Sequence, residues 1–405
     1  MRISGRDLGA VAIYYLYKAT KAVEFYRPIM YVFFLSRGVS FTGIATLEIA
    51  YNVTTVLAEV PTGYVGDRVG RRNSLAIGTV LIVVALVGLG LGGSFPVFLG
   101  FYVVWSTGYT FRSGTEDAWL YDTLVARLDE SSFSHVRGRG ESVALLTGVV
   151  AAVIGGYLAD VSLALPFFVA AGVTALGIPL LLALPEPETE DGIEVLTPRR
   201  ALGITREAVS RRHLRSFVVL YYVLLSSGLY LAFVFLQPVV TDVFATVGIP
   251  EGRIGSSLGW YYAGISLVGA VLSYNAGWIE ATVGRRAWFY GLPMFVAGVY
   301  AGLYVVPLLA LPGLLLVRSV GDVTRTFAAG YVNDRIGSAG RATVLSAMSM
   351  VASLAVVPLQ FLGGVISDAA SPSLAFAVGG AVLLGGSALV VLLESPFGDR
   401  SPTSL

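Results

Sequence analysis

The sequence predicts an all-α membrane protein with twelve transmembrane helices arranged as two bundles of six. Three observations carry this prediction: the composition, the number of long apolar segments, and a repeat between the two halves. The chain of 405 residues is 55% hydrophobic and only 13% charged. A soluble domain carries about 25% charged residues. Because open sheet edges cannot exist in lipid, each long apolar segment is expected to be a helix.

Twelve apolar segments are long enough to cross a bilayer, since about 20 apolar residues span its hydrocarbon core. They are residues 12–36, 41–62, 73–94, 96–120, 140–160, 164–184, 215–238, 254–277, 287–306, 311–332, 342–366 and 373–393. The longest polar interruption begins acidic and proline-rich and ends arginine-rich. It divides the chain into an N-terminal bundle, a cytoplasmic linker and a C-terminal bundle, residues 1–184, 185–214 and 215–405.

The basic residues of the loops predict the orientation of the chain in the membrane. With the N-terminus inside, only Arg37 and Arg253 fall on the outer side among the basic residues between spans. Cytoplasmic loops collect Lys and Arg, so this asymmetry predicts that both termini are cytoplasmic. We therefore expect a multi-pass protein of the plasma membrane.

Short motifs recur at corresponding places in the two halves. The pattern Gly-x6-Gly-Arg-Arg of residues 63–72 returns in residues 277–286. The pattern Gly-Gly-x3-Asp of residues 155–160 returns in residues 363–368. Two six-helix repeats are typical of secondary transporters, whose site lies near the bilayer midplane where the repeats meet.

One loop motif is more specific than a basic turn. The pattern G-x-x-x-D-R-x-G-R-R after the second span is met in full, by Gly63, Asp67, Arg68, Gly70, Arg71 and Arg72. With this motif, the span count and the repeat, the chain resembles the major facilitator superfamily over essentially its whole length. The resemblance implies a gate, in which Asp67 and the arginines lock the cytoplasmic ends of the bundles when the cavity faces outward. Members of the family carry an arginine in the fourth span, and the resemblance implies that Arg112 is this residue.

Two departures from the family patterns limit which roles the resemblance can assign to residues of this sequence. The second copy of the loop motif has Ala281 where the aspartate would stand and Glu280 one position earlier. The full gating charge is therefore expected only in the first copy. The glycine run of the fifth span, residues 148–156, lacks the proline of the drug/proton antiporters. Its absence counts against proton-driven drug export.

Six basic and six acidic residues lie within or at the ends of the predicted spans. They are Lys18, Lys21, Arg27, Arg112, Arg318 and Arg325, with Glu24, Glu48, Glu59, Glu116, Asp117 and Asp322. A charge at the bilayer centre costs about 3 kcal/mol on insertion scales, so such residues usually face a cavity or a partner. They form either a polar lining with Glu24 or Asp322 as proton carrier, or a structural network of ion pairs. For those at the cytoplasmic end, pairing or gating is favoured.

The candidate cavity residues combine the mid-span charges with polar residues of three spans. They are Lys21, Glu24, Arg27, Asn52, Tyr222, Ser226, Tyr262, Asp322 and Arg325. Asn52 is included because an amide in lipid needs a hydrogen-bond partner. Tyrosine is common both in packing and in the interface belt, so packing is the favoured interpretation for any single tyrosine.

The composition also excludes several classes of function. The chain has no cysteine and two distant histidines, His135 and His213, so we expect no metal site and no cofactor. A net charge of +1 gives no support for nucleic-acid binding. The sequence also lacks the phosphate-binding loop of ATP-driven pumps.

The sequence thus predicts a secondary active transporter of a small polar or amphipathic solute, working by alternating access and not as an enzyme. Its partners would be the solute, a coupling ion such as a proton or sodium, and the lipid bilayer. A transporter-like sensor that no longer cycles is an alternative, since the second motif copy is degenerate. A membrane-embedded enzyme is the least supported alternative. A measurement of flux distinguishes the transporter from the sensor, because a sensor binds its ligand without moving it across the membrane.

Overall fold

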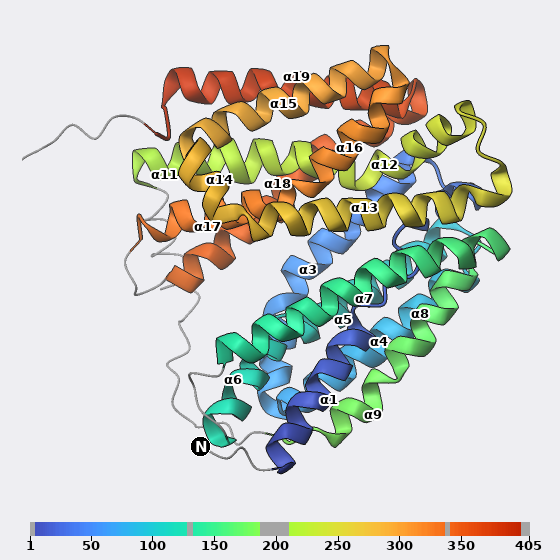
Figure 1. Ribbon diagram of the computed structural model, residues 1–405, viewed down its shortest axis with the longest axis vertical. Helices are drawn as coiled ribbons and strands as arrows, with labels where there is room; N and C mark the ends of the chain where they lie inside the picture. Colours follow the sequence, from blue (N-terminus) through green and yellow to red (C-terminus); the bar gives the residue numbers. More distant parts are fainter. Residues whose placement is uncertain (1–4, 128–132, 187–209, 337–340, 398–405) are drawn as a thin grey trace, which may run out of the picture. The chain divides into compact units, whose positions relative to one another are not determined.

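A computed structural model of the chain describes residues 5–127, 133–186, 210–336 and 341–397 (Figure 1). These described residues form helices and turns and contain no strand. The predicted linker 185–214 lies largely outside them, with only its two ends included.

The described helices account for the twelve predicted spans. The first six spans are α1 (Gly5–Lys21) with α2 (Met30–Ser36), α3 (Phe41–Val69), α4 (Arg71–Leu91), α5 (Phe95–Arg112) with α6 (Thr115–Arg127), α7 (Phe133–Val161), and α8 (Leu165–Ala175) with α9 (Gly177–Ala183). The last six are α11 (Arg212–Phe217), which continues through the π-helical η2 (Val218–Leu225) into α12 (Ser226–Thr246), α13 (Ile254–Tyr274) with α14 (Ala276–Val283), α15 (Arg285–Val305), α16 (Ala310–Ser319) with α17 (Gly321–Asn333), α18 (Arg341–Ala369), and α19 (Pro372–Leu393). Two 3₁₀ turns, η3 (Glu251–Arg253) and η4 (Pro307–Leu309), precede α13 and α16.

Within the described part of the chain, nine helical segments meet a membrane-span criterion of length and hydropathy alone. The three predicted spans outside this set are the first, the fourth and the eighth. The first is divided into α1 and α2, each shorter than a bilayer crossing. In α5 and α13, tyrosine, hydroxyl and glycine residues lower the mean hydropathy without breaking the helix.

The first span is not the continuous helix that the sequence predicts for residues 12–36. Residues 22–29, between α1 and α2, form turns and irregular backbone. Pro28 has no backbone N–H, and its ring disfavours a helical conformation for the preceding residue, Arg27. The interruption places Glu24 and Arg27 on non-helical backbone.

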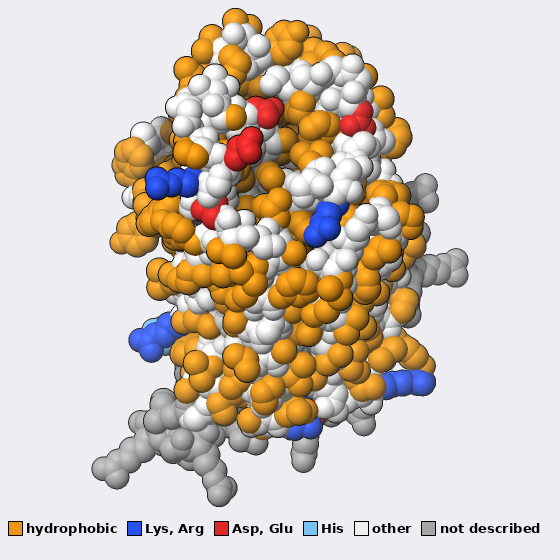
Figure 2. All heavy atoms as spheres, turned by 90° about the vertical axis from the view of Figure 1, so that its right-hand side faces the viewer, with side chains coloured by type: hydrophobic (Ala, Val, Ile, Leu, Met, Phe, Trp, Pro, Cys, Tyr) orange, Lys and Arg blue, Asp and Glu red, His pale blue; other side chains and the backbone are white. Residues whose placement is uncertain are grey.

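The outer surfaces of the helices are apolar. Large side chains such as Leu146, Trp278 and Leu392 are 71%, 68% and 83% exposed, and Figure 2 shows hydrophobic side chains covering much of one face. A soluble monomer rarely exposes so large a contiguous apolar surface. These faces are the ones that lipid would cover.

The chain divides into two compact units. Unit 1 contains residues 1–39, 46–193 and 244–264, and unit 2 contains residues 40–45, 194–243 and 265–405. In unit 1, α4 packs against α5, α8 and α9, and α1 packs against α7 and α9 (Figure 1). In unit 2, α15 packs along α19, and α18 packs against α19 and η2.

Glycines bring α4 and α5 into close contact. A Cβ added at Gly78 would lie 2.6 Å from the Gly108 carbonyl oxygen, and one at Gly108 would lie 2.9 Å from the Gly78 carbonyl oxygen. Small residues allow such close approach of helices in membranes. The same packing places the Arg112 side chain, at the end of α5, against Gly78.

Candidate functional site

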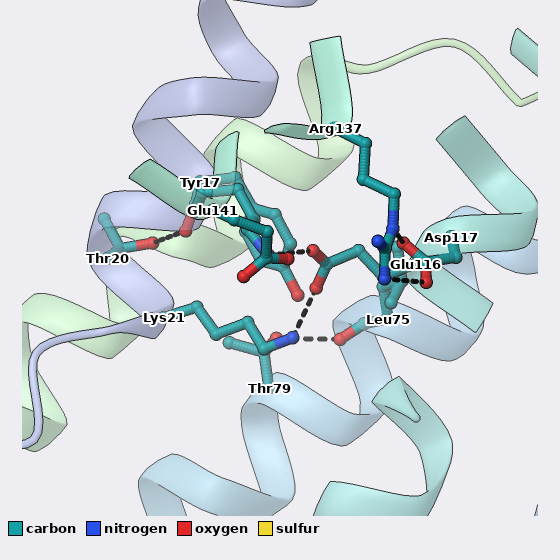
Figure 3. A network of polar contacts seen from close by, with 10 residues as sticks. Tyr17, Thr20, Lys21, Leu75, Thr79, Glu116, Asp117, Arg137 and Glu141 are labelled. Atoms are coloured by element: carbon teal, nitrogen blue, oxygen red, sulfur yellow. Dashed lines mark hydrogen bonds and ion pairs between the residues drawn. The ribbon is translucent and has the colours of Figure 1, made fainter. Parts of the chain in front are cut away.

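Four charged side chains from α1, α6 and α7 form an ion-pair network in unit 1, here named the lysine–glutamate cluster: Lys18, Lys21, Glu116 and Glu141. Lys18 Nζ lies 2.8 Å from Glu116 Oε1 and 2.8 Å from Glu141 Oε1. Lys21 Nζ pairs with the second carboxylate oxygen of Glu116 (Figure 3). One glutamate therefore joins both lysines of the chain.

The cluster has a buried side and an exposed side. The side chains of Lys18 and Glu116 are 6% and 7% exposed, whereas those of Lys21 and Glu141 are 32% and 48% exposed. A charged group within a membrane protein is tolerated where it is paired or lines a cavity. Lys18 and Glu116 are tolerated because they are paired. The side chains of Lys21 and Glu141 are also partly exposed.

Local structure brings these groups together. Lys18 and Lys21 are three residues apart in the last turn of α1, so they share one face of the helix. Glu116 lies in the first turn of α6, where unpaired N–H groups and the helix dipole favour a carboxylate. The rings of Tyr14 in α1 and Trp119 in α6 stack with centroids 6.0 Å apart. This aromatic contact joins α1 to α6.

Arg112 lies beside the cluster as a further buried cation. It is 4% exposed, and within the described residues its Nε and Nη2 atoms have no hydrogen-bond partner. Its Cζ atom lies 5.7 Å from the centroid of the Tyr17 ring. The sequence assigned Arg112 to the gate, and the structure places it against Tyr17 of α1, the residue before Lys18.

A second ion pair borders the cluster at its exposed side. Arg137 donates from Nε to Asp117 Oδ1 at 2.8 Å and from Nη2 to Asp117 Oδ2 at 2.9 Å (Figure 3). Their side chains are 45% and 47% exposed. This bidentate geometry joins α6 to α7.

Glu24 and Arg27 pair with each other on the non-helical segment after α1. Arg27 Nε lies 2.7 Å from Glu24 Oε2, and Arg27 Nη2 lies 3.1 Å from Glu24 Oε1. The arginine Cζ atom also lies 5.7 Å from the Trp105 ring centroid. Both hydrogen bonds favour the ionised carboxylate, because its two oxygens accept from one guanidinium.

Glu48 of α3 is a buried carboxylate in an aromatic setting. It is 4% exposed, and its Oε1 atom accepts hydrogen bonds from Tyr31 and Tyr102, each at 3.0 Å. The candidate residue Asn52 follows one helical turn later and is 9% exposed. The two polar side chains thus lie in the buried part of the same helix.

The gating motif occupies the end of α3, a turn at Gly70 and the start of α4. Arg71 Nε lies 2.5 Å from Asp122 Oδ2 of α6. Glu186 accepts from the Arg72 backbone N–H at 3.1 Å and lies 3.4 Å from its Nε atom. The last two motif arginines are thus held inside unit 1.

The first part of the motif is more open. Gly63 and Asp67 are exposed, and Asp67 has no ion pair within the described residues. Arg68 Cζ lies 4.4 Å from the centroid of the Tyr64 ring. The carboxylate to which the resemblance gives the locking role is therefore exposed.

The degenerate second copy of the motif retains one of these pairs. Gly284, at the turn between α14 and α15, has a φ of 76°, compared with 89° for Gly70. Arg285 lies 2.5 Å from Asp334 at the end of α17, as Arg71 lies beside Asp122. Glu280 Oε1 lies 2.5 Å from Arg285 Nε. Glu280, one position before Ala281, thus supplies a carboxylate within the second motif.

The remaining candidate residues are dispersed. In unit 2, Tyr222 is buried in η2, and Ser226 donates to the Tyr221 carbonyl at 2.9 Å. Asp322 and Arg325 of α17 are 3.6 Å apart, with side chains 70% and 77% exposed. In unit 1, Tyr262 of α13 is 9% exposed. Lys21 lies in the lysine–glutamate cluster, and the Glu24–Arg27 pair follows it on the segment after α1.

Several residues of the site were not among the candidate cavity residues of the sequence, including Lys18 and Glu116, which were counted only among the charges of the spans. Glu141 pairs with Lys18 across 123 positions of sequence, and no local pattern indicates such a partner. Glu48 was counted among the charges of the spans without a role. Two tyrosines within reach of a span glutamate are the signal that could have singled it out.

The geometry can be compared with known proteins. Residues 22–359 match the sequence model of the Major Facilitator Superfamily. No curated protein sequence matches the chain. The fold is similar to that of the nucleoside transporter NupG, with a TM-score of 0.77 and 11% identity over 98% of this chain and 100% of that one.

Two further solved structures show the same fold. A bacterial homolog of the human lysosomal transporter Spinster, inward-facing and unoccupied, has a TM-score of 0.69 and 17% identity over 96% of this chain and 95% of its own. A D-xylose-proton symporter has a TM-score of 0.64 and 13% identity over 95% of this chain and 96% of its own. At these identities the likeness concerns the fold alone.

Proposed function

The chain belongs to the Major Facilitator Superfamily, and from this premise we propose that it is a secondary active transporter of a small polar solute. Alternating access about a central site is the mode of transport of such two-bundle proteins. The proposal places the protein in the plasma membrane with both termini cytoplasmic. The fold also serves a nucleoside transporter and a D-xylose-proton symporter, and it is therefore compatible with polar cargo and proton coupling.

The lysine–glutamate cluster is the observation that carries the proposal. A protein that only anchors or packs in lipid has little use for a partly exposed lysine next to a buried carboxylate, because charged groups within spans are costly. Lys21 combines these features, since it is 32% exposed and paired with Glu116. Such a side chain can exchange its protein partner for a group on the solute.

The charges of this region favour a solute that carries a negative group. Lys18 and Lys21 pair with the carboxylates Glu116 and Glu141, and the neighbouring pairs Glu24–Arg27 and Asp117–Arg137 are each neutral. The positive charge of Arg112, which is buried against the Tyr17 ring, remains in excess. A carboxylate or phosphate on the solute would balance it, since buried charges require partners.

A thermal-shift screen of purified protein with small carboxylic acids, each beside its neutral amide, tests this preference. The acids are expected to raise the melting temperature and the amides to leave it unchanged. Lys21→Gln should abolish the shift, whereas Arg137→Gln, in the exposed pair, should retain it. An equal shift with acids and amides would reject the charge argument and leave a neutral polar solute.

Coupling to an ion gradient is the second part of the proposal, with Glu24 or Asp322 as the proton carrier suggested by the sequence. Reconstituted vesicles would be loaded with a solute found in the screen, and its flux measured with and without a proton or sodium gradient. Gradient-driven flux is expected. If Glu24→Gln and Asp322→Asn both keep it in full, neither residue is the carrier. Binding without flux would identify a sensor.

A further inference from the structure

Arg318 of α16 is a cation of unit 2 that has no ion pair within the described residues. Its Nε atom is buried and has no hydrogen-bond partner there. About 12 Å of helix separates it from Ala310, the first residue of α16. It therefore lies inside the predicted span 311–332, within the ~30 Å hydrocarbon core of a bilayer. A charge in this setting is expected to face a partner or a cavity.

Two features of the chain lower the cost of this charge without neutralising it. Arg318 lies in the last turn of α16, where the helix dipole places roughly half a negative charge. Its Cζ atom lies 4.9 Å from the centroid of the Phe233 ring of α12, within the distance of a cation–π contact. Neither the helix end nor the ring supplies a full counter-charge. The guanidinium therefore retains most of its positive charge without compensation.

Arg318 shares one side of its span with two other charged residues. Asp322 and Arg325 follow it by four and seven residues, a spacing that places side chains on one side of a helix. Val320, between α16 and α17, keeps a helical backbone with φ of −77° and ψ of −8°. Asp322 and Arg325 are 3.6 Å apart, and their side chains are 70% and 77% exposed. This side of the span is therefore open, and its charges sum to one positive charge.

The side of α16 that lipid would cover is a different one. Leu316 is 40% exposed, and it lines an apolar groove together with Pro312 and with Met294 of α15. Arg318 follows Leu316 by two residues, which corresponds to about 200° around the helix axis. The uncompensated charge thus lies on the side of α16 opposite to the apolar groove.

We propose that Arg318 binds the negatively charged group, a carboxylate or a phosphate, of the transported solute. This inference rests on the proposed transporter function and gives unit 2 a recognition residue of its own. A guanidinium presents its N–H donors as a planar fork that matches two oxygens of a carboxylate or phosphate. The rings of Tyr230 and Phe233, stacked with centroids 5.1 Å apart, form an apolar wall beside it. Arg318 thus determines the preference for an acid over the neutral amide of the same shape.

Affinity measurements on purified protein test this role. The probes are benzoate, succinate and inorganic phosphate, with benzamide and succinamide as neutral counterparts, titrated by thermal shift. Arg318→Met removes the charge but keeps an unbranched side chain, and it is expected to weaken binding of the anions about tenfold or more, the factor for a lost hydrogen bond to a charged group. Arg318→Lys keeps a point charge without the fork and should lose less.

Arg212→Met is the matched control in the same unit. The Arg212 side chain is 75% exposed, and its partner Glu394 also pairs with Arg215. This variant should bind the anions as the natural protein does. The amides should not distinguish any of these variants, because a neutral amide offers only one acceptor oxygen to the guanidinium.

The melting temperature without any probe separates recognition from a structural role. Arg318→Met removes a charge that has no ion-pair partner within the described residues, so no counter-charge is left unpaired. The melting temperature is therefore expected to stay the same or to rise. A structural cation would behave in the opposite way, because its removal would strand the group that it neutralises.

Unchanged affinity for the anions in Arg318→Met would overturn the proposal, and so would a lower melting temperature of this variant without probe. An absence of any anion-dependent shift in the natural protein would also overturn it. Flux of a neutral solute would then still support the transporter function. If the anions bind in an Arg318-dependent way but no flux is found, Arg318 remains an anion-binding residue and the transporter function fails.

Discussion

Glu116 and Asp117 are adjacent in α6, but their carboxylates differ in burial and in the number of ion-pair partners. Glu116 is 7% exposed and shared by two lysines, whereas Asp117 is 47% exposed and paired with one arginine. Glu116→Gln is expected to destabilise the protein by about 3 kcal/mol, because buried Lys18 then keeps only Glu141 as a counter-charge and Lys21 loses its carboxylate partner. Asp117→Asn should cost less than about 1 kcal/mol. Unfolding of both variants in mixed micelles measures the difference. Equal losses would show that Glu116 is not a central partner of the lysines.

Gly70 is a second position where a small change, the addition of a Cβ atom, is expected to destabilise the protein. Its φ of 89° and ψ of 152° lie in a region that is essentially restricted to glycine. A Cβ there would also lie 2.6 Å from Glu186 Oε1, whereas nothing lies within 4 Å at the equivalent Gly284. Gly284→Ala should cost about 1–3 kcal/mol from backbone strain alone. Gly70→Ala should cost more, and it should displace Glu186 from the start of α4. Equal melting temperatures for the two variants would contradict this reading.

At the residue scale, the sequence predicted the presence of paired charges better than their partners. The balance of acidic and basic residues in the spans indicated mutual pairing, as Glu24 with Arg27 illustrates. The partners of Lys18 lie 98 and 123 positions away, at Glu116 and Glu141. Such contacts depend on the depth and rotation of three helices. Hydrophobic spacing alone does not determine either quantity.

Helix ends were the least predictable feature at the element scale. The apolar run of residues 12–36 predicts one helix, although Pro28 within it is a known helix breaker. Apolar length identifies the membrane crossing, but it does not distinguish a continuous helix from α1 and α2 joined by turns. The turn at Gly70 was predictable, because a glycine between two apolar runs can adopt a positive φ.

An ion pair also joins the gating-motif turn at Gly70 to the neighbouring helix α6. Arg71 and Asp122 are 19% and 21% exposed, and their pair joins the start of α4 to α6. A double-mutant cycle with Arg71→Gln and Asp122→Asn is expected to give a coupling energy of about 1 kcal/mol. The matched pair Arg285 and Asp334 should give a smaller value. There the aspartate is 59% exposed and the arginine has Glu280 as a second partner. A larger coupling in the second copy would contradict this account.

At the scale of the whole molecule, the half-repeat predicted more than the span count. The glycine and arginine patterns located corresponding turns in the two halves, and Gly70 and Gly284 share a positive φ. The sequence did not indicate that Asp160 and Asp368 cap other helices, because each reads as a polar residue ending its own span. That contact becomes visible only when the first residues of α13 and α3 are placed beside them.

The predicted orientation can be tested on the intact chain, because it has no natural cysteine. Glu251 and Arg139 are both exposed and are expected on opposite sides of the membrane. In intact cells, a membrane-impermeant maleimide should label Glu251→Cys at once, but Arg139→Cys only after permeabilisation. The reason is that loops near clustered arginines stay in the cytoplasm. The reverse pattern would invert the predicted topology. Labelling of both variants in intact cells would instead mean that the span count between residues 139 and 251 is wrong.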